Sequence, residues 1–166
     1  MKYSLLMLFF ISFLLFANPN ELMKSAYMNS LSVKEFHLTQ YALFDICKSE
    51  IEDRETLNKW LNSKQPEFEL AEDIRALFVN KGLENKGNAL KKAFTQHLST
   101  IDSKVAQTVL PFTSAQELDK SKACNKWSNA LSNPNSALLL RYKEKIDFLK
   151  GNFGEINKAI NTASNW

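Results

Sequence analysis

The sequence predicts an all-α fold, a single-domain bundle of about six to seven helices braced by one disulfide. Apolar residues recur three and four positions apart along most of the chain, which is the spacing of one helix face. No segment of useful length alternates polar and apolar residues, as a half-buried strand would. The chain has only 4 glycines and 4 prolines, and they fall where helices are expected to begin and end.

Two helices are expected before residue 51. Asn18–Pro19 begins a short first helix. A capping box from Ser32 to Glu35 opens the next one, because the serine hydroxyl and the glutamate carboxylate can each satisfy a free backbone amide. Apolar residues line two sides of this second helix, so we expect it to lie at the centre of the bundle.

The apolar pattern shifts after this central helix. Around Glu50–Arg54 the stripe moves by about a quarter turn, so either the helix kinks there or a new one starts at Asp53. Gln65–Pro66 opens the next helix, because proline is tolerated at the first helical position. Gly82 is expected to close that helix in a left-handed C-cap.

The longest regular helix is expected to follow Gly87–Asn88 and to end at Pro111. Its predicted core face is a single stripe: Leu90, Phe94, His97, Ile101, Val105 and Thr108. His97 is therefore expected to be a core histidine bonded to a carbonyl or a carboxylate. The alternative is an axial ligand to a noncovalent haem, with His37 or a methionine opposite.

Two further helices complete the predicted bundle. A second capping box, Ser114–Glu117, opens a helix whose apolar face includes Cys124 and Trp127. Asn133–Pro134 begins another helix, which Gly151 is expected to close before a last helical turn or two.

Residues 1–17 have the pattern of a secretory signal peptide. Lys2 precedes an apolar run from Leu5 to Phe16, and Ala17 supplies the small residue before the cut. This run is shorter than the roughly 20 residues of a membrane-spanning helix, and an uncleaved N-terminal anchor is the alternative. We therefore expect a mature domain of residues 18–166, periplasmic or secreted, without a stable membrane span after cleavage.

The two cysteines, Cys47 and Cys124, predict a disulfide. An even number of cysteines in an oxidising compartment favours pairing, and both lie on core-facing stripes. Two buried free thiols are the alternative. Neither cysteine belongs to a Cys-x-x-Cys motif, so neither a thioredoxin-like redox site nor covalent haem attachment is expected.

The charge pattern argues against nucleic acid and anionic membranes as partners. The net charge is only +3, and basic and acidic residues are interspersed. No Asn-x-Ser/Thr glycosylation site occurs despite many asparagines, which favours a bacterial protein. The expected partner is an envelope or secreted protein.

No catalytic, cofactor-binding or metal-binding residue is predicted. The chain has only two histidines, and it lacks a calcium loop, a phosphate-binding loop and a nucleophile elbow. Acidic residues near helix starts are expected to favour the helix dipole rather than to act in acid–base catalysis. They form two clusters, the first being Glu50, Glu52, Asp53 and Glu55 and the second Glu67, Glu69, Glu72 and Asp73.

These observations favour an exported, noncatalytic binding module that acts on a protein partner, of inhibitor, immunity-type or chaperone character. Three off-stripe apolar residues form either its candidate interaction surface or a second layer of core: Leu118, Leu140 and Phe148. The first alternative is a carrier of an apolar ligand in a cavity between helices, which the phenylalanine-rich stripes favour. The second is a hydrolase whose carboxylate site carries no motif.

Overall fold

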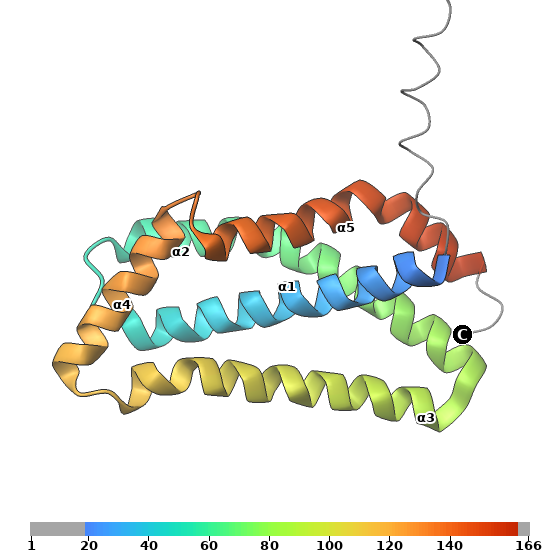
Figure 1. Cartoon of the computed structure of the whole chain (residues 1–166), viewed down its shortest axis with the longest axis horizontal. Coiled ribbons are helices and arrows are strands. Elements are labelled where there is room, and N and C mark those ends of the chain that lie inside the picture. The colour runs from blue at the N-terminus through green and yellow to red at the C-terminus, as the bar shows by residue number, and fades with distance from the viewer. Residues whose placement is uncertain (1–18, 163–166) are drawn as a thin grey trace, which may run out of the picture.

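The computed structural model describes residues 19–162, apart from the side chains of 82–91, 93 and 94. The predicted signal peptide, residues 1–17, lies outside the described residues. Five helices and no strand form the described part of the chain, which confirms the all-α prediction (Figure 1). The helices are α1 (Pro19–Cys47), α2 (Arg54–Ser63), α3 (Gln65–Ser114), α4 (Glu117–Ser132) and α5 (Ala137–Thr162).

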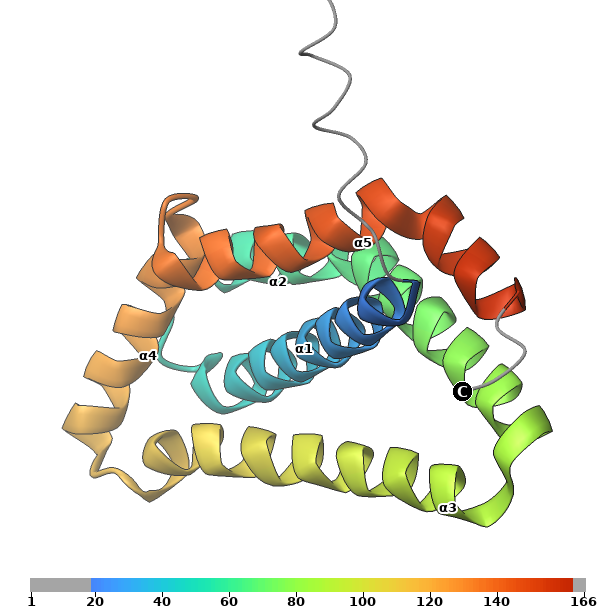
Figure 2. The same cartoon turned by 45° about the vertical axis from the view of Figure 1, so that its right-hand side comes forward.

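Helix α1 lies in the middle of the molecule and contacts every other described helix. In Figure 2, α3, α4 and α5 surround it, and α3 bends so that its second half returns along α1. This arrangement confirms the prediction of a central helix, because a helix that is apolar on two sides must be covered on both. None of the described helices is long and apolar enough to cross a membrane.

The described residues hold five helices rather than the six or seven expected, because several predicted boundaries lie inside continuous helices. Ser32 does not cap a helix: its hydroxyl donates to the carbonyl of Met28 at 3.0 Å, and α1 runs straight through. The expected end at Gly151 is also wrong, since α5 continues to Thr162. A glycine inside a helix costs only about 1 kcal/mol, which the burial of Ile156 beyond it outweighs.

The expected break between Gly82 and Gly87 is a bend within α3 instead. By the colour bar of Figure 1, the change of direction falls between residues 80 and 100. Kinks in long helices commonly occur at glycine, where no side chain restrains the backbone. The two glycines lie near this bend, and α3 continues past both of them.

Other helix ends show which sequence signals were reliable. Asp53 is the N-cap of α2, and its carboxylate accepts a hydrogen bond from the amide of Thr56 at 3.1 Å, so a new helix does start there. Gln65–Pro66 begins α3 as predicted. Pro111, the expected end of that helix, lies inside its last turns. Proline disturbs the turn that precedes it, so the residues after it can still complete the helix.

The second capping box is also wrong. The hydroxyl of Ser114 donates back to the carbonyl of Leu110 at 2.7 Å, so it is unavailable as a cap. Helix α4 begins at Glu117 after Gln116, whose side chain makes no capping bond. At the start of α5 the cap is Ser136, whose hydroxyl accepts a hydrogen bond from the amide of Leu139 at 3.3 Å.

The buried residues form two clusters. The larger one lies where α1, the first half of α3 and α5 meet, and it includes the fully buried Ile74 and Leu149. The smaller one surrounds Cys47 and Cys124. Hydrophobic burial in these clusters is the main force that holds the five helices together.

The second half of α3 differs from its predicted core stripe. Among the members of that stripe whose side chains the structure describes, only Ile101 is buried; Val105 is half-buried, and His97 and Thr108 are exposed. The side chains of two further members, Leu90 and Phe94, lie outside the described residues. Figure 2 shows the cause, because this half of α3 packs on one side only. A helix with one neighbour needs only a narrow apolar seam.

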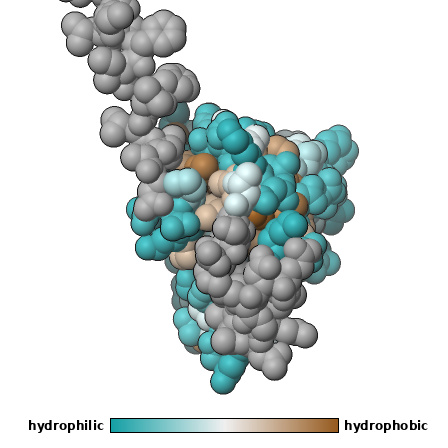
Figure 3. Space-filling model, turned by 90° about the vertical axis from the view of Figure 1, so that its right-hand side faces the viewer, coloured by the Kyte–Doolittle hydropathy of each residue, from teal (hydrophilic) through white to brown (hydrophobic). Residues whose placement is uncertain are grey.

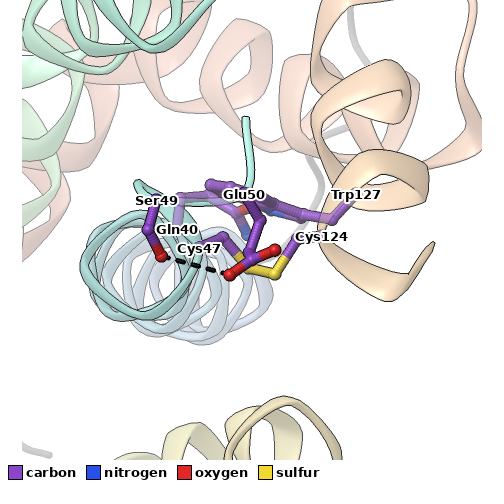
Figure 4. Close-up of a disulfide and its surroundings, with 6 residues drawn as sticks. All are labelled: Gln40, Cys47, Ser49, Glu50, Cys124 and Trp127. Carbon is purple, nitrogen blue, oxygen red and sulfur yellow. Dashed lines mark hydrogen bonds between the residues drawn. A yellow bond between two sulfur atoms is a disulfide. The ribbon is translucent and has the colours of Figure 1, made fainter. Parts of the chain in front are cut away.

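The predicted disulfide joins Cys47, the last residue of α1, to Cys124 in α4 (Figure 4). The sulfur atoms lie 1.96 Å apart and the Cα atoms 5.4 Å apart. Both cysteines are fully buried. Beside them the indole N–H of Trp127 donates to the side-chain carbonyl of Gln40 at 2.7 Å, which joins α4 to α1 a second time.

Candidate functional site

A groove of about 600 Å³ lies between α1, α5 and the second half of α3. Its α1 wall contains Ser32, Phe36 and Thr39, which lie one helical turn apart and therefore share a face. The ring of Phe36 stacks on the ring of Tyr142 from α5, with centroids 4.1 Å apart and planes 26° apart. This aromatic pair gives the groove an apolar wall. We call this site the α1–α5 groove.

Two buried polar side chains line the α1–α5 groove. Thr39 is 7% exposed and Gln40 is 3% exposed. The carbonyl oxygen of Gln40 accepts the hydrogen bond from Trp127, but its NH₂ group has no acceptor among the described residues. The hydroxyl of Thr39 also lacks a hydrogen bond to any described residue. Buried polar groups are normally satisfied, so these two donors require an explanation.

The rim of the groove is cationic. Arg141 and Lys145 lie one turn apart on α5, and neither pairs with a described residue. The carboxylate of Glu35 also lines the groove, but Lys104 of α3 pairs with it at 3.4 Å. The two α5 cations therefore remain uncompensated, which gives the groove a positive potential.

Two residues of the first acidic cluster, Asp53 and Glu55, lie at a helix start, where acidic side chains are expected. Asp53 caps α2, and Glu55 in the first turn of α2 pairs with Lys59 at 2.7 Å. Glu50 accepts a hydrogen bond from the hydroxyl of Ser49 at 3.2 Å, as Figure 4 shows. These residues do not line the α1–α5 groove.

Glu67 of the second cluster connects α3 to α5. Its carboxylate accepts hydrogen bonds from the hydroxyl of Tyr142 and from the ammonium of Lys150, each at 2.9 Å, and Lys64 lies 3.6 Å away. Burial alone would raise the pKa of Glu67, but these hydrogen bonds and cations outweigh it and lower the pKa. Burial, together with the charge of Glu67, raises the pKa of Tyr142.

Glu72 connects α3 to α1 in the same way. Its carboxylate pairs with Lys34 of α1 at 3.1 Å and with Arg75 one turn along α3. Burial tends to raise its pKa, and the hydrogen bonds from Arg75 and Lys34 lower it further than burial raises it. Both glutamates are thus ionised and engaged in ion pairs.

The expectation that His97 is a core histidine is wrong. The imidazole is exposed, and its Nδ1 lies 3.3 Å from the hydroxyl of Tyr27, with ring centroids 5.8 Å apart. The partner is a phenol rather than a carbonyl or a carboxylate. Burial raises the pKa of Tyr27 to about 12, so this phenol stays protonated at neutral pH.

His37 lies in a different environment. Its ring stacks on Phe68 at 4.1 Å and tilts against Tyr41 at 4.6 Å. Burial lowers its pKa; Glu72 raises it and Lys34 lowers it. His37 and the Tyr27 that contacts His97 are separated by about 15 Å along α1, so the two histidines do not face each other across one site. No group of three metal-ligating side chains occurs among the described residues.

The three residues expected as an interaction surface are not gathered in one place. Leu118 is 69% exposed and Leu140 is 51% exposed. Leu118 lies in the first turn of α4 and Leu140 in the first turn of α5, so the length of α4, about 24 Å, separates them (Figure 1). Phe148 is half-buried and packs against the larger core cluster.

The coloured surface in Figure 3, at the end of the molecule where α1 begins and α5 ends, is mainly hydrophilic. Figure 3 shows small hydrophobic areas there, separated by polar side chains. Single exposed apolar residues are normal on soluble proteins. The exposed apolar side chains therefore define no site by themselves.

Sequence reasoning missed the residues of the α1–α5 groove: Thr39, Gln40, Arg141 and Lys145. The available signal was two adjacent polar residues in the helix expected at the centre of the bundle. Polar side chains are rare in such a position unless they have partners or a function. Comparison with protein-family models, curated proteins and solved structures gives no match to this chain.

Proposed function

We propose that this chain is an exported, noncatalytic binding module that acts on a protein partner through the α1–α5 groove, with inhibitor, immunity-type or chaperone character. The observation that carries the proposal is the pair of buried donors without partners, Thr39 and Gln40, at the floor of a groove with a cationic rim. Such donors are disfavoured in a purely structural role, because burying them without partners is unfavourable. A bound partner group would satisfy them.

The shape of the groove supports a protein partner over an enclosed apolar ligand. Sites for small apolar ligands are enclosed and bury most of the ligand surface. This groove instead has exposed residues in its walls, among them Ser32, Thr108 and Arg141. A segment of a protein chain can enter such a groove and remain partly in solvent.

The state of the carboxylates supports binding over hydrolysis. A carboxyl group that acts as a general acid at neutral pH needs a raised pKa. Glu67 and Glu72 have lowered pKa values and do not line the groove. Glu35, which does line it, is paired with Lys104.

The disulfide supports export. Disulfides form and persist in oxidising compartments and are rare in the reducing cytosol. The bond between Cys47 and Cys124 therefore fits the signal-peptide pattern of residues 1–17 and a periplasmic or secreted location.

Filling the groove tests the proposed function. Ala137 is exposed and lines the groove at the start of α5, so Ala137→Trp should occupy the site without disturbing the core. We expect the immobilised parent chain to capture a protein from an envelope extract and the variant to lose it. Ala76→Trp is the matched control, since Ala76 is exposed on α3 and does not line the groove.

Both variants should keep the parent's circular dichroism and melting temperature. Capture that survives Ala137→Trp unchanged would show that the groove is not the binding site. An extract from which the parent chain captures nothing would contradict the protein partner.

A further inference from the structure

The free donors of the groove have a defined chemistry. The indole N–H of Trp127 can only donate, so it fixes the side-chain carbonyl of Gln40 toward α4 (Figure 4). The NH₂ group of Gln40 is then the part of the side-chain amide that is available to a ligand in the groove. It can only donate a hydrogen bond, and the adjacent Thr39 hydroxyl can donate another. A ligand at the floor of the groove would therefore need a hydrogen-bond acceptor to pair with these donors.

The charges at the rim select an anionic acceptor. Arg141 and Lys145 project from successive turns of α5, and the one carboxylate that lines the groove is already paired with Lys104. The planar guanidinium of arginine matches the two oxygens of a carboxylate. The stacked rings of Phe36 and Tyr142 offer an apolar wall for the side chain beside that carboxylate.

We propose that the α1–α5 groove recognises a carboxylate group of the partner protein, held by Arg141 and Lys145 and by the donors of Thr39 and Gln40. The carboxylate is either the C-terminus of the partner or an aspartate or glutamate side chain. This inference rests on the proposed function and adds the chemical group that the groove selects.

Three acetylated tripeptides test this inference on the disulfide-bonded mature chain. The first is Leu-Phe-Leu with a free C-terminal carboxylate, the second is the same peptide as its amide, and the third is Leu-Asp-Leu amide. We expect the side-chain NH₂ resonances of Gln40 to shift on titration with a carboxylate peptide. The Leu-Phe-Leu amide should bind about tenfold or more weakly, because it lacks the charged acceptor.

The first and third peptides distinguish the two sources of the carboxylate. Stronger binding of the free-terminus peptide assigns the site to a C-terminus. Stronger binding of the Asp peptide assigns it to an acidic side chain.

Substitutions separate recognition from folding. Arg141→Ala should weaken binding of the favoured carboxylate peptide about tenfold or more. Lys143→Ala is the matched control, because Lys143 pairs with Asp147 and lies outside the groove. Thr39→Val removes the hydroxyl but keeps the side-chain shape, so it should weaken binding several-fold while the melting temperature stays equal or rises.

Equal binding of the Leu-Phe-Leu acid and its amide, or Gln40 resonances that do not move with any peptide, would overturn the carboxylate inference. If Ala137→Trp still abolished protein capture in that case, the proposed function would stand without it. If the carboxylate peptides bound but the envelope extract supplied no protein, the groove chemistry would stand and the protein partner would be wrong.

Discussion

At the residue scale, Glu67 and Glu72 show how the sequence stabilises the fold with half-buried charges. Each lies on the first half of α3 and pairs with cations and hydrogen-bond donors, Glu67 toward α5 and Glu72 toward α1. Sequence reasoning assigned both to the helix dipole because their spacing places them near a helix start. Their ties to α1 and α5 could not be predicted, since these depend on which helices pack together.

Glu67→Gln should destabilise the fold in a pH-dependent way. A lowered folded-state pKa stabilises the protein above the unfolded value of 4.5, and this contribution is lost as pH falls through the folded value. We expect a loss of about 1 kcal/mol at pH 7, since the site is partly screened by solvent. Chemical denaturation at pH 7 and near pH 3 would measure it.

The control is Glu55→Gln, whose pair with Lys59 is exposed and should change stability by less than about 0.5 kcal/mol. The difference between Glu67→Gln and the parent should shrink at the acidic pH. A difference that is the same at both pH values would show that the charge of Glu67 is not its cause.

At the element scale, the apolar periodicity located the helical segments correctly. The local signals for helix ends gave the wrong number of helices. Asp53 and Pro66 mark true helix starts. Ser32 and Ser114 instead bond back to carbonyls of their own helices, a use of the hydroxyl that the same sequence pattern permits. Gly151 lies inside α5, because tertiary packing outweighs the cost of about 1 kcal/mol for placing a glycine in a helix.

The disulfide was predictable because the chain has only two cysteines and both lie on apolar stripes. Replacing Cys47 and Cys124 by alanine should destabilise the fold by about 4 kcal/mol in the chain-entropy model, since the bond spans 77 positions. Urea denaturation of the parent and of the double variant measures this difference. In the unreduced parent, both sulfurs should resist alkylation even after unfolding; two freely alkylated thiols would contradict the bond.

At the scale of the whole molecule, the α1–α5 groove arises from segments that are far apart in the sequence. It needs the bend in α3, which returns the second half of that helix along α1 (Figure 2). Nothing in the local pattern of Arg141 or Lys145 indicates that they lack acidic partners. The central position of α1 was predictable. The groove was not, because it depends on how α1, α3 and α5 pack together, and the sequence pattern of one helix does not determine this packing.

Site-specific photocrosslinking in living cells tests the central claim most directly. A benzoylphenylalanine at position 137 would lie in the α1–α5 groove, and one at position 76 would lie on exposed α3 outside it. The proposed function predicts a crosslinked adduct with an envelope protein from position 137 and none from position 76. An adduct from position 76 alone, or equal adducts from both positions, would contradict a partner held in the groove.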